Sequence, residues 1–285
     1  FYIDNVFVPN INHFPQQGAS GGNIGMLNMD FVENVEVFTG GFGAAYGNKL
    51  SSVFNIAYRE GNRERVNGQL NLSAIGVGAQ LEGPMPGKRG AWMFSGNRSY
   101  LDLIAKALDM DNPADFYDLQ GKATYDLGAG DRLSLLAVGG SSRTDYDHGD
   151  RELFSYATAG LNWRHLWGDS GYSDTSVSWS FLDGTENEYW ESEGGIHEQY
   201  DYSNKWLTFR NVNHLRLASG PQLEFGAEAQ HVRFRNWDDF DDAVTRLSAT
   251  SAGAFAACTV QPFPHFSLTA GARVDFEVVP HLVLG

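Results

Sequence analysis

From Val66 onward, apolar and polar residues alternate with a period of two, the spacing of a β-strand that has two different faces. The clearest run spans residues 117–127, where one face is apolar and the other is fully polar. The apolar set is Tyr117, Leu119, Ala123, Tyr125 and Leu127, and the polar set is Asp118, Gln120, Lys122, Thr124 and Asp126. The same separation recurs in residues 174–181, 223–230 and 266–275. The pattern predicts about eleven strands after Val66.

The predicted connections between these strands alternate in length. Short turns cover residues 84–89, 128–130, 168–171, 218–221 and 261–264, and longer loops cover residues 99–113, 145–151, 183–202 and 236–245. Up-and-down barrels of the outer membrane have tight turns at one end and long loops at the other. A soluble β-sandwich also alternates apolar and polar residues, but its topology gives no reason for alternating loop lengths. The pattern therefore favours part of a membrane barrel, about half of one with about 22 strands.

The first 61 residues lack the repeated period-two alternation of the later strands. A short strand is predicted at residues 2–8, a polar, glycine-rich loop at residues 9–23, and a helical turn at residues 26–31. Val35 and Val37 alternate with Glu36 and Phe38 in the pattern of a strand. A separately patterned N-terminal region is therefore expected before the strand repeat begins.

A glycine cluster at Gly40, Gly41, Gly43 and Gly47 follows that strand and suggests a phosphate-binding loop. However, Tyr46 occupies the place of the third glycine in a dinucleotide fingerprint, and the residues that follow favour a strand. A phosphate site of this kind needs a helix whose N-terminus points at the anion. The glycines are therefore interpreted as turn formers.

Residues 29–61 resemble the end of the plug domain of TonB-dependent outer-membrane receptors. In that family an acidic strand precedes a glycine-rich turn with Tyr-Gly, and a strand then leads into the barrel. Two later stretches, residues 81–84 with 95–101 and residues 271–275, resemble runs that open the barrel and lie in its middle. The motif positions for which the resemblance implies a structural role are Val35, Glu36, Val37, Gly40, Tyr46, Gly47, Asn55, Ile56, Arg98, Gly271, Arg273 and Asp275.

The resemblance implies an all-β fold, namely a partial antiparallel transmembrane β-barrel of about eleven strands preceded by the end of a small α+β plug domain. The plug part is expected to cover residues 1–62, and the N-terminal half of the barrel residues 63–285. Both ends of the sequence fall inside strand-like runs, so an internal fragment of a longer protein is expected.

Composition narrows the range of partners. The net charge of −15 without a basic tract argues against nucleic acid, because phosphate contacts need clustered Lys and Arg. No stretch of eighteen apolar residues is present that would predict a membrane helix. The single Cys258 is expected to be a packed small side chain.

No motif for catalysis is evident. The eight histidines are scattered, and neither H-E-x-x-H nor G-x-S-x-G occurs, so a zinc hydrolase or serine hydrolase is not predicted. Acidic residues crowd the predicted loops at residues 183–201 and 238–242, where carboxylates can bind Ca²⁺. Without regular ligand spacing, a solvated acidic loop is the better interpretation, and neither a cofactor nor a bound metal is expected.

The loop at residues 9–23 is the candidate ligand contact. In the family that the chain resembles, plug loops that point outward help to form the ligand pocket. The candidate residues are His13, Phe14, Gln16 and Gln17.

The resemblance implies energy-coupled uptake of a scarce ligand across the outer membrane of a Gram-negative-type bacterium. The implied partners are membrane lipid, a ferric siderophore, cobalamin or oligosaccharide ligand, and the TonB complex through a segment upstream of residue 1. The protein would not be an enzyme. Two alternatives stay open, namely a passive outer-membrane porin and a secreted β-rich carbohydrate-binding protein.

Overall fold

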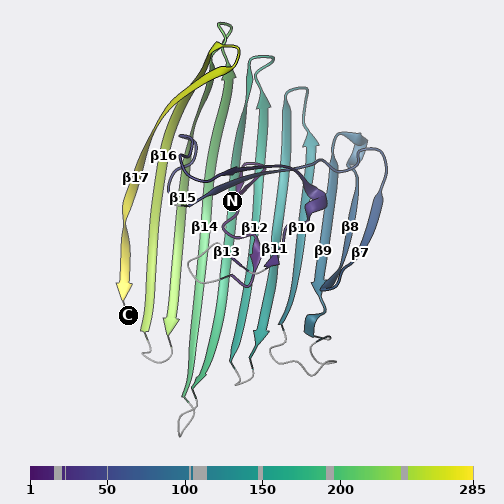
Figure 1. Ribbon diagram of the computed structural model, residues 1–285, viewed down its shortest axis with the longest axis vertical. Coiled ribbons are helices and arrows are strands. Elements are labelled where there is room, and N and C mark those ends of the chain that lie inside the picture. The colour runs from purple at the N-terminus through teal and green to yellow at the C-terminus, as the bar shows by residue number, and fades with distance from the viewer. Residues whose placement is uncertain are drawn as a thin grey trace.

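The computed structural model describes residues 1–15, 21–22, 24–49, 51–102, 104, 114–146, 150–190, 196–238 and 243–284. Its main body is one eleven-stranded antiparallel sheet in which neighbours in sequence are neighbours in space (Figure 1). The strands are β7 (Asn67–Leu72), β8 (Gly76–Pro84), β9 (Ala91–Ser99), β10 (Ala114–Asp126), β11 (Asp131–Asp145), β12 (Arg151–Leu166), β13 (Gly171–Trp190), β14 (Ile196–Arg216), β15 (Gln222–Asp238), β16 (Ala243–Phe263) and β17 (Phe266–Leu284). The all-β fold and the count of about eleven strands are confirmed. The sheet is curved and open, with β7 and β17 at its edges.

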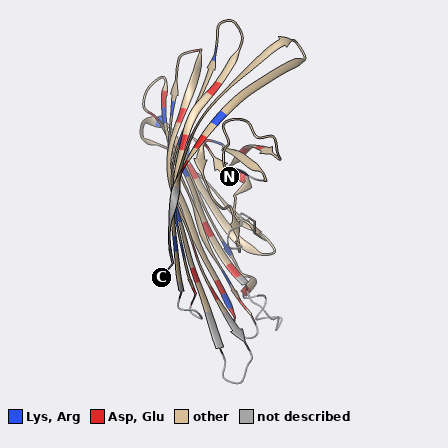
Figure 2. Cartoon of the chain, turned by 90° about the vertical axis from the view of Figure 1, so that its left-hand side faces the viewer, with Lys and Arg blue, Asp and Glu red and all other residues tan. Residues whose placement is uncertain are grey.

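A smaller four-stranded sheet, in the order β2-β1-β6-β5, packs against one face of the large sheet (Figure 2). Its strands are β1 (Tyr2–Ile3), β2 (Val6–Phe7), β5 (Val32–Phe38) and β6 (Val53–Tyr58). A two-stranded ribbon of β3 (Asn12–His13) and β4 (Ile24–Gly25) and a 3₁₀ turn at Met29–Phe31 complete this part. We call residues 1–61 the N-terminal segment and the face of the large sheet that it covers the inner wall.

The two faces of the large sheet have opposite characters, as the alternation predicts. On β13, Val177 and Trp179 point outward and are 49% and 48% exposed, whereas Ser178 between them is 3% exposed. On β10, Leu119 is exposed and Asp118 is buried. The apolar residues therefore cover the outside and the polar residues lie beneath the N-terminal segment, the reverse of a water-soluble sheet.

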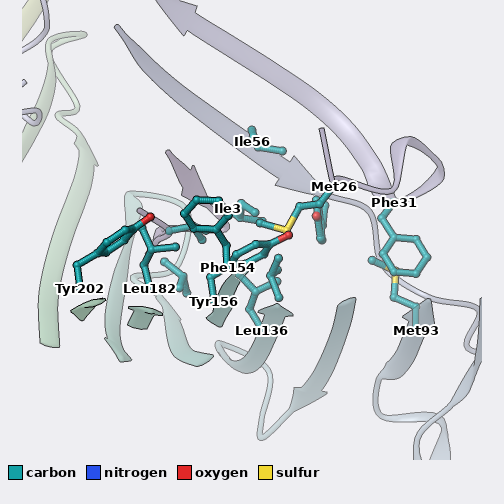
Figure 3. Close-up of a cluster of buried hydrophobic side chains, with 14 residues drawn as sticks. Ile3, Met26, Phe31, Ile56, Met93, Leu136, Phe154, Tyr156, Leu182 and Tyr202 are labelled. Atoms are coloured by element: carbon teal, nitrogen blue, oxygen red, sulfur yellow. The ribbon is translucent and has the colours of Figure 1, made fainter. Parts of the chain in front are cut away.

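The apolar core lies between the N-terminal segment and the inner wall. Its largest cluster joins Ile3, Met26, Phe31 and Ile56 of the segment to wall residues on five strands (Figure 3). The wall contributes Met93, Leu136, Val138, Phe154, Tyr156, Leu182 and Tyr202. The segment is thus packed onto the wall by hydrophobic contact as well as by polar contact.

Two of the predicted long loops are wrong. Strand β13 continues to Trp190 and β14 begins at Ile196, so the connection covers only residues 191–195. Likewise, β15 and β16 continue the hairpin through most of residues 236–245. The acidic sequence hid these strand ends, because a hairpin with water on both faces needs no apolar alternation. Most residues of these two predicted loops belong instead to the ends of strands β13, β14, β15 and β16.

The predicted single strand at residues 2–8 is also wrong. It is a hairpin, β1–β2, that turns at Asp4 and Asn5 with positive φ angles of 49° and 67°. Asp and Asn adopt this left-handed conformation more readily than most residues, which makes them suitable for a tight two-residue hairpin turn. The turn places both side chains at the inner wall. No helix in the described part of the chain is long and apolar enough to cross a membrane.

The outward face gives a direct test of lipid contact. Val177→Arg is expected to lower the stability of the membrane-inserted protein by about 2–4 kcal/mol, because a cation would enter the hydrocarbon region. Leu217→Arg, in the turn after β14, is the matched control and should be neutral. Urea unfolding in lipid vesicles measures both, and equal stability of the two variants would contradict a lipid-facing Val177.

Candidate functional site

The interface between the N-terminal segment and the inner wall is centred on Arg210 of β14, which is 3% exposed. Its Nε donates to Asn5 Oδ1 at 3.0 Å and its Nη1 to the Ala45 carbonyl oxygen at 2.9 Å. It also forms an ion pair with Glu228 on the neighbouring β15. The guanidinium lies over the Tyr2 ring, 4.5 Å from its centroid. One wall side chain therefore holds two separate parts of the segment.

The aromatic residues around Arg210 belong to the segment. The Tyr2 hydroxyl donates to Glu228 Oε2 at 3.1 Å, and the Tyr46 ring lies 5.6 Å from the Tyr2 ring. Burial, followed by the charge of Glu228, raises the pKa of the Tyr2 phenol, and burial raises the pKa of Tyr46 to about 12. Both phenols therefore stay protonated, which keeps Tyr2 available as a donor to Glu228.

The Asp4–Asn5 turn makes a second set of contacts across several wall strands. Ser176 Oγ of β13 donates to the Asn5 carbonyl oxygen at 2.7 Å. Lys122 of β10 lies 2.8 Å from Asp4 Oδ2. Burial raises the pKa of Asp4, and the Lys122 charge opposes that shift. The turn is thus fixed to strands on both sides of β12.

Close approach of the hairpin to the wall depends on Gly160 of β12. A Cβ atom added to Gly160 would lie 2.4 Å from Val6 Cγ1, well inside van der Waals contact. The glycine therefore makes room for a buried Val6 side chain in the middle of an otherwise side-chain-lined wall.

Two motifs that are far apart in sequence meet at a third contact. Arg273 of β17 donates from Nη1 to the Ala45 carbonyl oxygen at 3.4 Å, across 228 residues, and its Nε lies 2.8 Å from Asp275 Oδ1. A Cβ atom on Gly47 would lie 2.2 Å from Arg273 Nε. Gly271 in turn lies against Ala44, whose Cβ would be 3.1 Å from a Cβ added there. The Tyr-Gly turn and the Gly-x-Arg-x-Asp strand therefore interlock.

The remaining motif residues take varied positions. Glu36 of β5 accepts a hydrogen bond from Asn55 of β6 at 3.0 Å, and Ile56 is buried in the core. Gly40 has a φ of +102°, which only glycine adopts without strain. The other three are exposed: Val35 and Val37 on β5, and Arg98 on the outward face of β9.

The candidate ligand residues divide into three groups. His13 is fully buried, with Nε2 3.1 Å from Asp118 Oδ2 and Nδ1 2.7 Å from the Tyr156 hydroxyl. Phe14 is partly exposed, and its backbone N–H donates to Ser142 Oγ at 3.0 Å. Gln16 and Gln17 lie outside the described residues. In this structure the His13 side chain bonds the loop to the inner wall. Of the two candidate residues that the structure describes, only Phe14 has exposed surface.

A polar cavity of about 500 Å³ lies between the segment and strands β12–β15. It is lined near the short turns by Arg164 and Asp174, an ion pair with Nη2 and Oδ2 2.8 Å apart, and by His214 and Glu224. On the segment side it is lined by Glu36 and Asn55, among others. Arg210 and Tyr2 also line this cavity, which therefore extends from the contacts of Arg210 toward the short-turn end.

The sequence did not single out Arg210, Glu228, Asn5 or Lys122. Periodicity placed Lys122 and Glu228 on polar strand faces, but it does not indicate which polar residues meet the N-terminal segment. No group of three His, Cys, Asp or Glu side chains among the described residues could hold a metal ion. The Ca²⁺ alternative for the acidic loops, which the sequence did not favour, rests largely on residues 188–198 and 239–242, whose side chains lie outside the described part.

Comparison with known proteins identifies the architecture. No protein-family model and no curated protein sequence matches the chain. Among solved structures, the closed form of the ferric-catecholate import receptor Fiu from E. coli K12 has a TM-score of 0.70 at 15% identity, covering 90% of this chain and 47% of that one. The ferripyoverdine receptor of Pseudomonas aeruginosa has a TM-score of 0.67 at 12% identity, covering 88% and 43%. The alcaligin receptor FauA from Bordetella pertussis has a TM-score of 0.65 at 12% identity, covering 90% and 46%.

The curved sheet with an apolar outside and a small sheet docked on its inner face has the architecture of part of a β-barrel with a small domain inside it. The chain has the fold of a partial TonB-dependent outer-membrane receptor, and it spans a little under half the length of the three structures described. The fold that the motif in residues 29–61 predicted is thereby confirmed.

The central role of Arg210 is tested by Arg210→Met, which keeps the length of the side chain and removes its donors. Removing one partner of a buried ion pair costs about 3–5 kcal/mol. The free energy of unfolding should therefore fall by that amount, and residues 1–61 should become sensitive to protease. The matched control is Arg151→Met, because the Arg151 and Asp145 side chains are 52% and 31% exposed in their ion pair. Its cost should stay within about 1 kcal/mol. Equal costs for both variants would contradict a central Arg210.

The seat of the hairpin is tested by Gly160→Val. Overpacking against Val6 should cost about 1–3 kcal/mol and raise the rate of proteolysis within residues 1–61. Gly128→Val is the control, because nothing lies within 4 Å of a Cβ added at that turn. Unchanged protease resistance of the Gly160 variant would show that the hairpin does not need this close approach.

Proposed function

We propose that the chain is part of a TonB-dependent receptor that takes up a scarce ligand across the outer membrane of a Gram-negative-type bacterium. Residues 1–62 form the end of the plug, and residues 63–285 form the N-terminal half of the barrel. The ligand class is a small molecule such as a siderophore or cobalamin, or an oligosaccharide. The protein transports and performs no covalent chemistry.

The observation that carries this proposal is the N-terminal segment docked on a polar wall. A passive porin needs the same outward apolar face but has no use for a small sheet that fills its interior. A secreted carbohydrate-binding protein would not expose Val177, Trp179 and Leu119 to water on one continuous face. The described contacts therefore favour a plugged transporter over both alternatives.

The interface also suggests how the plug can move. Its polar contacts are hydrogen bonds and ion pairs to individual wall side chains, and water can replace such partners as they separate. The cavity of about 500 Å³ next to Arg164 and Glu224 gives space on the short-turn side of the segment. A pulling force applied from upstream of residue 1 would act first on β1, whose Tyr2 lies against Arg210.

The plug is tested by deleting residues 1–61 from the complete receptor. The variant should form an open pore with a large increase in single-channel conductance in planar bilayers, because the polar inner wall becomes a water-filled channel. The complete receptor carrying Gly128→Val, which leaves the plug in place, is the control. Conductance that is the same with and without residues 1–61 would contradict a plugged transporter.

A further inference from the structure

The inner wall carries a row of three carboxylates and a tyrosine beyond the N-terminal segment, toward the ends of the strands opposite the short turns. Register places Glu152 of β12 opposite Glu186 of β13, Glu186 opposite Tyr200 of β14, and Tyr200 opposite Asp238 of β15. Glu152, Glu186 and Tyr200 have the inward parity of the buried Phe154, Leu182 and Tyr202 on the same strands, and Asp238 has the parity of the buried Glu228 on β15. We call Glu152, Glu186, Tyr200 and Asp238 the acidic row.

Like charges directly opposite each other on neighbouring strands destabilise a sheet. Glu152 and Glu186 are such a pair, and the charge of each also acts on the nearby Tyr146, whose hydroxyl hydrogen-bonds to Glu152. The described basic residues at this end occupy outward positions instead. They are Arg143, Arg151, Lys205, Arg233, Arg235 and Arg246. The two signs of charge are thus separated across the wall, and the inner side is negative.

A second observation comes from buried oxygen atoms next to the acidic row. The Tyr202 hydroxyl is without a hydrogen-bond partner among the described residues, although Tyr202 is only 3% exposed. Asn204 Oδ1, on a residue that is 7% exposed, and Asn236 Oδ1 on β15 also have no hydrogen-bond partner among the described residues. The Tyr202 ring lies over Gly184, two residues before Glu186, and Glu186 and Glu152 are the charges that act on it. Buried polar groups normally have partners, so these oxygens point to donors beyond the described residues.

We propose that the acidic row, with Tyr202 and Asn204 beneath it, is a recognition site for the cationic part of the ligand, an ammonium or guanidinium group. The inference rests on the proposed uptake function and names the charge class of its ligand. Carboxylates, a phenol oxygen and amide oxygens all accept hydrogen bonds, and protonated amines and guanidines supply several donors together with the opposite charge. A bare metal ion fits less well, because no three acidic or His side chains of the described residues are close enough to hold one.

The test is binding of a polyammonium probe, spermidine, to the complete receptor in detergent at fixed ionic strength. Citrate serves as the polyanion and Mg²⁺ as the inorganic cation. Wild-type receptor should bind spermidine saturably, and citrate should not bind. Mg²⁺ should weaken spermidine binding no more than an inert salt of the same ionic strength. Glu152→Gln/Glu186→Gln should weaken spermidine binding at least about tenfold, because each variant removes a charged acceptor.

The matched control is Glu33→Gln/Glu64→Gln, two exposed carboxylates elsewhere, which should leave spermidine affinity unchanged. Folding is followed separately by the thermal midpoint, which the Glu152/Glu186 variant should keep or raise because it removes opposed charges. Tyr202→Phe should weaken binding several-fold without lowering the midpoint, because its hydroxyl bonds nothing in the described chain.

Three results would each overturn the inference: no saturable spermidine binding, a preference for citrate, or equal loss of affinity in the control double variant. Displacement of spermidine by Mg²⁺ beyond its ionic-strength effect would assign the site to an inorganic cation and would also overturn it. Binding in detergent needs no energy source. Failed energised uptake with intact spermidine binding would therefore count against the proposed function alone.

Discussion

The buried guanidinium of Arg210 is the interaction on which the seating of the N-terminal segment depends. It joins the Asp4–Asn5 turn, the Ala45 carbonyl and the rings of Tyr2 and Tyr46 to one point on β14, and Glu228 balances its charge. A buried charge is tolerated only when it is paired and fully hydrogen-bonded. The geometry of the segment is therefore constrained more sharply here than in the hydrophobic cluster, whose contacts have no required direction.

That constraint follows from the inverted character of the sheet. A wall with Val177 and Trp179 outside has to keep its polar residues inside, so whatever fills the interior must satisfy serines, amides and charges. The N-terminal segment does so with backbone carbonyls and with Asn5, and it adds apolar patches where Met93, Leu136 and Phe154 interrupt the polar wall. The result is an interface that is specific in position and still composed of contacts that water can replace.

Much of this fold follows from the sequence, and the reasons for success and failure are physical. Period-two alternation reports two different environments, so it located the strands from residues 117–127 onward and assigned their faces. It failed in residues 183–202, because the strands continue where both faces are polar. It also missed the hairpin at Asp4 and Asn5, where conformation rather than hydrophobicity sets the turn. Contacts such as Arg210 with Tyr2 leave no periodic signal at all, since they join residues from distant elements of the chain.

The shared hold on the Ala45 carbonyl also orders events in time. Its donors lie on β14 and β17, and the second of them follows Ala45 by 228 residues. Contacts between such distant residues form slowly, because a long loop has to close before they gain anything. Until β17 has paired with β16, the Ala45 carbonyl oxygen in the glycine turn can have only one of its two arginine donors. Complete docking of the N-terminal segment therefore requires that the large sheet has formed as far as β17.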